Sequence, residues 1–153
     1  VYKRQGLRSH YLASWHAATL LFAAPAGAAI VNVSSPGGQQ YLYSASYGAG
    51  KAGLDRLSAD MAHELEPEAV ACISLYPGSV ATEFVRSVAE ERGRDVSDSQ
   101  TPLFVGRATA ALLAAPDLLE RSGSIQWVED LAVEFDLLDE TGRRPPGYRL
   151  RQS

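Results

Sequence analysis

The chain has 153 residues, enough for one domain with a hydrophobic core, and it contains 46% hydrophobic and 21% charged residues. Its formal net charge of −4 argues against binding a nucleic-acid backbone as the main task. No uninterrupted apolar stretch approaches the length of a membrane span. The single cysteine, Cys72, permits no internal disulfide and favours a cytoplasmic setting and a buried, inert thiol.

The first third of the chain predicts a helix and a strand. Residues 1–5 fit no element and resemble a translated sequencing adapter, so we expect them to be non-native. Residues 7–24 have apolar positions at helical spacing on more than one face, which predicts a helix covered on both sides. Residues 28–34 form a β-branched run without alternation, which indicates a strand covered on both faces. A Pro-Gly-Gly loop follows.

A second helix and strand complete a repeating unit. Residues 46–65 predict a helix with an apolar face and a wet face, and Asp55 belongs to the wet one. Residues 70–76 predict a strand. Strand, helix and strand of these lengths form a βαβ unit, so we expect a parallel sheet. Pro77 and Gly78 end the second strand.

The remaining elements are shorter. Residues 83–100 are polar and charged and predict a mobile helix or lid. Thr101 and Pro102 suit the start of a helix that runs to about residue 115. A third strand is expected at 124–128 and a short helix at 130–138. Residues 139–153 predict a surface tail.

Tyr47 and Lys51 have the spacing of a catalytic pair. Residues four apart lie on one face of a helix, so the hydroxyl and the ammonium can point into one site. A positive charge beside a tyrosine favours its phenolate form, and such a pair can exchange a proton with a substrate oxygen. Tyr41 and Tyr43, just before this helix, are either packing residues or part of a pocket wall.

Three segments are expected to meet at one rim of the sheet, because ligands of open parallel sheets bind at the carboxyl ends of the strands. Ser34 and Ser35 follow the first strand, and Pro77-Gly78 with Thr82 follows the second. The Tyr47 helix leaves from the same edge.

This pattern resembles the C-terminal part of a short-chain dehydrogenase/reductase. The resemblance rests on Ile30-Val-Asn-Val-Ser-Ser35, Tyr47-Gly-Ala-Gly-Lys51 (a Tyr-x-x-x-Lys motif) and Pro77-Gly-Ser-Val-Ala-Thr82, and it covers residues 6–138. The Ser-Pro-Gly-Gly run and the long tail past Trp127 are most similar to the dehydrogenase/reductase member 1-like subgroup. The resemblance implies an α/β fold, a Rossmann-like doubly wound parallel sheet, of which this chain would hold the C-terminal half only.

The resemblance also implies a reaction and its residues. The family transfers hydride between NAD(P)H and a small carbonyl or alcohol substrate. Ser35 would hold the substrate oxygen, Tyr47 would act as general acid or base, and Lys51 would favour the tyrosinate and bind the ribose of the cofactor. The nicotinamide end of the cofactor would contact the loop that contains Pro77, Gly78, Val80 and Thr82. Tyr47 and Lys51 would bind cofactor as well.

Several features depart from the family pattern. Ser35 lies twelve residues before Tyr47 rather than thirteen, so Ser34 is a rival for the serine role. The glycine-rich turn that seats the pyrophosphate is absent from the sequence, and with it the residue that selects NAD or NADP. We therefore expect a truncated, inactive fragment with an open strand edge at 28–34, which alone is poorly soluble and binds no dinucleotide. Helices 7–24 and 46–65 are expected to pair in a homodimer.

The main alternative is a non-catalytic relative that serves as a binding or scaffold protein. A serine hydrolase is disfavoured because the Gly-x-Ser-x-Gly pattern is missing. A nucleotide-sugar epimerase shares the Tyr-x-x-x-Lys chemistry, but the compact Pro-Gly-x-x-x-Thr segment favours the dehydrogenase form. No histidine has a second ligand at metal spacing, so no metal site is expected.

Overall fold

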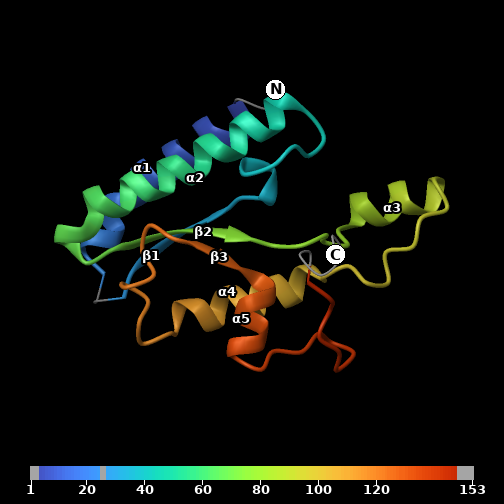
Figure 1. The fold of residues 1–153 in the computed structure, drawn as a ribbon. Coiled ribbons are helices and arrows are strands. Elements are labelled where there is room, and N and C mark those ends of the chain that lie inside the picture. The colour runs from blue at the N-terminus through green and yellow to red at the C-terminus, as the bar shows by residue number, and fades with distance from the viewer. Residues whose placement is uncertain (1–3, 25–26, 148–153) are drawn as a thin grey trace. The chain divides into compact units, whose positions relative to one another are not determined.

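The computed structural model describes residues 4–24 and 27–147. Every helix and strand predicted above is present, with ends displaced by a few residues (Figure 1). The elements are the π-helix Arg4–Arg8, α1 (Ser9–Phe22), β1 (Ala29–Val33), the 3-10 turn Pro36–Gly38, α2 (Ala45–Leu65), the 3-10 turn Glu66–Glu68, β2 (Ala71–Tyr76), α3 (Glu83–Glu91), α4 (Pro102–Leu113), β3 (Ile125–Trp127) and α5 (Val128–Glu134).

The described residues divide into two compact units, which are treated separately below. The first unit runs up to Tyr76 and includes Leu113–Gln126, and the second consists of Pro77–Leu112 and the residues from Trp127 onward. The predicted half-domain at 6–138 and the lid at 83–100 stay predictions. Of the predicted non-native segment 1–5, residues 1–3 lie outside the described residues, and residues 4 and 5 begin the π-helix. Residues 148–153 of the predicted tail also lie outside them.

The sheet has the order β1-β2-β3, and β1 and β2 run parallel with Ala29 opposite Ala71 and Val33 opposite Leu75. Because α2 connects these two parallel strands, they form the βαβ unit that the sequence predicts. β2 is buried at every residue. β1 lies at an edge of the sheet, and its last residue, Val33, is 46% exposed.

A buried polar side chain connects β1 to α2. Asn32 is 3% exposed, and its Nδ2 donates a hydrogen bond of 2.9 Å to Oγ of Ser58. The Ser58 hydroxyl in turn donates to the backbone carbonyl of Leu54. Since a buried amide without a partner is costly, this chain of bonds favours one position of the helix over the strand.

The helix α1 is less covered than its sequence suggests. It lies on the same side of the sheet as α2 (Figure 1), and Leu7 contacts Gly53 of that helix. Ser14 is its only buried residue among those described, while Trp15 is 65% and Leu20 is 75% exposed. The prediction that other parts of the chain bury this helix on both sides is therefore wrong for the described residues. Apolar residues on several faces show that a helix can be buried, but they do not show that the same chain buries it.

Several apolar side chains of the second unit are fully buried. They include Phe104 and Leu112 of α4 and Val128 and Leu131 of α5. Thr101 caps α4 as predicted, because its hydroxyl accepts a hydrogen bond of 3.1 Å from the amide of Phe104. Within the described ranges, no helix combines the length and the hydropathy that a membrane crossing requires.

We predict that Cys72 is unreactive in the native protein. It is fully buried in β2, and this burial raises the pKa of its thiol to about 11. Because the thiolate is the reactive form, a disulfide reagent at pH 8 should label it only as fast as the protein unfolds. Full labelling in denaturant is the control, and rapid labelling of the native protein would contradict the buried position of β2.

Candidate functional site

Tyr47 and Lys51 lie on one face at the start of α2. Ser44 begins this helix, because its hydroxyl accepts a hydrogen bond of 3.2 Å from the amide of Tyr47. Nζ of Lys51 lies 6.0 Å from the centroid of the Tyr47 ring and donates a hydrogen bond of 3.0 Å to the carbonyl oxygen of Val33. One side chain thus reaches from α2 to the carboxyl end of β1, next to the tyrosine.

Two glycines allow the loop after β1 to approach α2 closely. A Cβ at Gly37 would lie 2.6 Å from Cε1 of Tyr47, so any side chain there would displace the ring. A Cβ at Gly38 would lie 3.0 Å from backbone atoms of Lys51 and Ala52. The Pro-Gly-Gly run is therefore required by packing against the first turns of α2, and it places the loop directly beside the Tyr47 ring.

The two candidate serines have different surroundings. Ser34 is 4% exposed, and its hydroxyl donates to the backbone carbonyl of Lys51 at 3.5 Å. Ser35 is half-buried, and its oxygen accepts a hydrogen bond of 3.1 Å from the amide of Gly37. That bond leaves the hydroxyl hydrogen of Ser35 to donate elsewhere. The surroundings therefore favour Ser35 over Ser34 as the serine that meets a substrate.

Asp55 lies beside Tyr47 and Lys51 in the candidate site, although the sequence pattern predicts it on the solvent-exposed face of α2. Its Oδ2 accepts a hydrogen bond of 2.5 Å from the hydroxyl of Tyr76, the fully buried last residue of β2. Its Oδ1 is buried and has no hydrogen-bond partner in the part of the chain that the structure describes. The prediction of a solvent-exposed Asp55 is therefore wrong. Residues 47, 51 and 55 are four apart, so the helical spacing that pairs Tyr47 with Lys51 also places Asp55 on the same face.

The charges around Lys51 have opposing effects. Burial lowers the pKa of the Lys51 ammonium, and the neighbouring Asp55 carboxylate raises it. Burial, together with the hydrogen bond to Asp55, raises the pKa of Tyr76. Tyr76 therefore stays a protonated donor to Asp55, and Asp55 helps to keep Lys51 charged beside Tyr47.

The loop 77–82, which carries the other predicted site residues, belongs to the second unit. Gln100 is 2% exposed and holds this loop. Its side-chain oxygen accepts from the amide of Gly78 at 3.1 Å, and its backbone bonds to Ser79 and Ala81 on either side of Val80. Nothing in the sequence pattern singled out Gln100 beyond its position just before the capping residue of α4.

The side-chain nitrogen of Gln100, next to Gly78, is a hydrogen-bond donor without an acceptor among the described residues. A Cβ at Gly78 would lie 3.2 Å from Nε2 of Gln100, and this nitrogen is buried without a partner among the described residues. Such an orphaned donor is costly unless a carbonyl oxygen reaches it. Thr82, at the end of the loop, caps α3 by accepting a hydrogen bond of 3.3 Å from the amide of Val85. Pro77 and Val80 are half-buried.

Comparison with known proteins identifies the family. The short chain dehydrogenase family model matches residues 6–93, which is more than half of the chain. The chain belongs to the short-chain dehydrogenases. It is 40% identical to the mouse (Mus musculus) dehydrogenase/reductase SDR family member 1 over 154 residues, a match that covers 94% of this chain and 49% of the mouse protein. The chain thus spans about half the length of the curated relatives it matches.

Solved structures of this kind share the fold. A short chain dehydrogenase from Mycobacterium thermoresistibile superposes with a TM-score of 0.70 at 22% identity, over 94% of this chain and 51% of that chain. The structure of ElxO with NADP bound has a TM-score of 0.64 at 22% identity, over 78% of this chain and 51% of that chain. The parallel sheet with its helices is therefore part of a Rossmann-like α/β fold.

We predict that Gly37→Ala displaces the Tyr47 ring. The added methyl would lie inside contact distance of the ring, which also packs edge-on against Tyr43 at 5.2 Å. The NMR signals of the Tyr47 ring should therefore shift, since the ring leaves its place beside Tyr43. Gly50→Ala is the matched control: a Cβ there has no neighbour within 4 Å, so the signals should stay in place. Unchanged Tyr47 signals in Gly37→Ala would contradict the packing described here.

We also predict that Asp55→Asn lowers the pKa of Lys51 further, because it removes the charge that opposes the effect of burial. The chain has only two lysines, Lys3 and Lys51, so lysine-selective ¹³Cε labelling yields two titrating signals, assigned with Lys3→Arg. Asp60→Asn is the control, since that carboxylate lies on the same helix but pairs with Arg56. An unchanged or raised pKa in Asp55→Asn would show that Asp55 does not act on Lys51.

Proposed function

We propose that this chain supplies the catalytic residues and the nicotinamide-binding loop of an NAD(P)-dependent oxidoreductase that interconverts small carbonyl and alcohol compounds. The observation that supports this most is the position of the Lys51 ammonium, 6.0 Å from the Tyr47 ring centroid and anchored on Val33 at the end of β1. A tyrosine beside a held cation can give a proton to a substrate oxygen or take one from it.

Each catalytic residue has one task in this proposal. Tyr47 protonates the carbonyl oxygen during reduction and removes the hydroxyl proton during oxidation. Ser35 donates its free hydroxyl hydrogen to the same oxygen and stabilises the negative charge that develops there. Lys51 stays charged and stabilises the tyrosinate left after proton transfer. Asp55 and Tyr76 do not touch the substrate in this proposal, and they act through Lys51.

The residues present fit an NAD(P)H cofactor, which the relatives' names and the NADP bound in ElxO suggest. When bound, NAD(P)H would supply the hydride for carbonyl reduction, and the oxidised form NAD(P)+ would accept it in alcohol oxidation. Lys51 uses one of its three N–H donors on Val33, so two are left for ribose hydroxyls. The orphaned Nε2 of Gln100 beside Gly78 suits a carboxamide oxygen. We assign cofactor contacts to Tyr47, Lys51, Pro77, Gly78, Val80 and Thr82.

Three further proposals concern the whole protein. No glycine-rich turn occurs in the 153 residues, so we propose that they are inactive alone and work only together with a cofactor-binding half. The exposed Trp15 and Leu20 support a homodimer through α1 and α2. The lone, buried Cys72 supports a cytoplasmic location.

We predict that Tyr47→Phe reduces carbonyl-dependent NAD(P)H oxidation by about 10²- to 10⁴-fold, the usual contribution of a general acid. The assay uses the longer protein that this proposal implies, with its reading frame determined by long-read sequencing of the source DNA, and a panel of small aldehydes and ketones. Tyr11→Phe, on α1 and outside the site, is the matched control and should retain full activity.

The outcomes separate the candidate functions. Activity that survives Tyr47→Phe would show that the tyrosine is not the acid. If the unaltered protein oxidises no NAD(P)H with any carbonyl but still binds the dinucleotide, the non-catalytic scaffold alternative takes first place.

A further inference from the structure

The loop 77–82 depends on a short neighbouring segment, residues 97–101. Gln100 bonds to both sides of Val80 through its backbone and to Gly78 through its side chain. The hydroxyls of Ser79 and Ser99 add a bond of 3.0 Å. Loops are normally the most mobile parts of a fold. Segment 97–101 therefore restrains loop 77–82, and movement of the segment would allow the loop to move as well.

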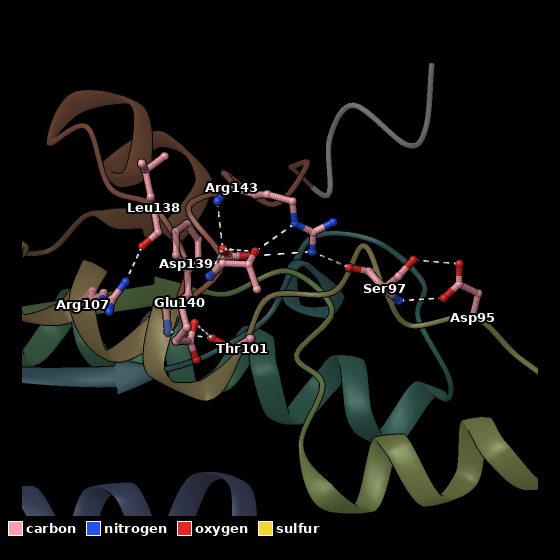
Figure 2. Close-up of polar contacts among 10 residues, drawn as sticks. Asp95, Ser97, Thr101, Arg107, Leu138, Asp139, Glu140 and Arg143 are labelled. Carbon is pink, nitrogen blue, oxygen red and sulfur yellow. Dashed lines mark hydrogen bonds and ion pairs between the residues drawn. The ribbon is translucent and has the colours of Figure 1, made fainter.

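Segment 97–101 is itself held by a turn near the end of the chain, residues 138–143, which we call the C-terminal turn. Figure 2 shows Asp139 at its centre, and this side chain is 6% exposed. Its Oδ1 accepts three hydrogen bonds, from the amide and hydroxyl of Thr141 at 2.8 and 2.6 Å and from the amide of Arg143 at 2.9 Å. These bonds hold the carboxylate charged, and they lower the pKa of Asp139. The turn is thus preformed around one acceptor oxygen.

Three bonds connect the C-terminal turn to the rest of the second unit (Figure 2). Nη2 of Arg143 donates to the carbonyl oxygen of Ser97 at 3.2 Å. The hydroxyl of Thr101 donates to Glu140 at 2.7 Å. Arg107 of α4 donates to the carbonyl oxygen of Leu138 at 2.6 Å. Two of the three bonds therefore hold segment 97–101, one at each of its ends, with Gln100 between them.

We propose that the C-terminal turn positions the nicotinamide-binding loop 77–82, acting through segment 97–101 and Gln100. This inference rests on the proposed function for the cofactor contact of the loop, while the mechanical link rests only on the contacts above. Asp139 and Arg143 are positioning residues in this proposal. The described part of the tail is mostly exposed, but Asp139 and Pro145 are buried, and in this proposal these anchored positions support the cofactor site.

The chain offers a matched pair of variants for the test. Arg143→Gln removes the bond to Ser97. Arg144→Gln alters the next arginine, whose bonds within the described residues go to Asp136 and to the carbonyl oxygen of Leu137, just before the C-terminal turn. A second pair acts on the centre of the turn: Asp139→Ala removes the acceptor, whereas Asp139→Asn keeps an oxygen that can accept the same bonds.

The first measurement is hydrogen exchange followed by mass spectrometry, on the 153-residue chain and on the longer reading frame. Arg143→Gln and Asp139→Ala should raise exchange in peptides covering 77–82 and 97–101, by about tenfold for the lost charge-assisted bonds. Peptides covering β2 should not change. Arg144→Gln should match the unaltered protein, and Asp139→Asn should recover most of the protection. The second measurement is the affinity of the longer protein for NADH and for NADPH; the affinity for whichever of the two it binds should fall together with protection.

The outcomes distinguish this inference from the proposed function. If exchange at 77–82 is unchanged in both Arg143→Gln and Asp139→Ala, the C-terminal turn does not position the loop and the inference is overturned. A uniform rise that includes β2 would overturn it too, because it would show general destabilisation. If exchange rises as expected but the unaltered longer protein binds neither NADH nor NADPH, the link is supported and the proposed function fails.

Discussion

The close approach of the Pro-Gly-Gly turn to α2 is the constraint on which the candidate active site depends. Gly37 leaves room for the Tyr47 ring, and Gly38 lets the loop backbone meet the backbone of α2. Asn32 fixes the same strand to the same helix deeper in the core. With these contacts, Tyr47 and Lys51 lie on the helix α2, and Ser35 lies in a loop that packs closely against that helix. A site built this way needs little reorganisation before a substrate binds.

The structure shows that Asp55 and Tyr76 lie next to the Tyr47–Lys51 pair and influence the charge of Lys51. A half-buried lysine tends to lose its proton, and a nearby carboxylate opposes that tendency. Asp55 supplies the carboxylate and Tyr76 orients it from the last position of β2. The charge balance around Lys51 that the proposed chemistry needs therefore comes from two elements, the helix α2 and the end of the central strand β2.

Much of this could be predicted from the sequence because it follows from local pattern. The strand–helix–strand lengths predict the parallel pair, Thr101-Pro102 predicts the start of α4, and four-residue spacing predicts the Tyr47–Lys51 face. The exposure of α1 and the burial of Asp139 could not be predicted, since they depend on what distant parts of the chain cover. The four-residue spacing also predicts Asp55 on this face, but its charge and its charged neighbours favour a solvent-exposed position, which is why the sequence pattern alone gives the wrong prediction.

The two parts of the candidate site are supported in opposite ways. Around Tyr47, the loop packs closely against α2 because Gly37 and Gly38 have no side chains, and these two glycines can be recognised in the sequence. Around loop 77–82 the support is a buried glutamine and a turn closed on an aspartate, and neither residue type signals a binding site by itself. Glycine motifs are visible in a sequence because few residues can replace them. Polar supports such as Gln100 and Asp139 can be recognised only through their hydrogen bonds, because neither residue type is restricted to such positions.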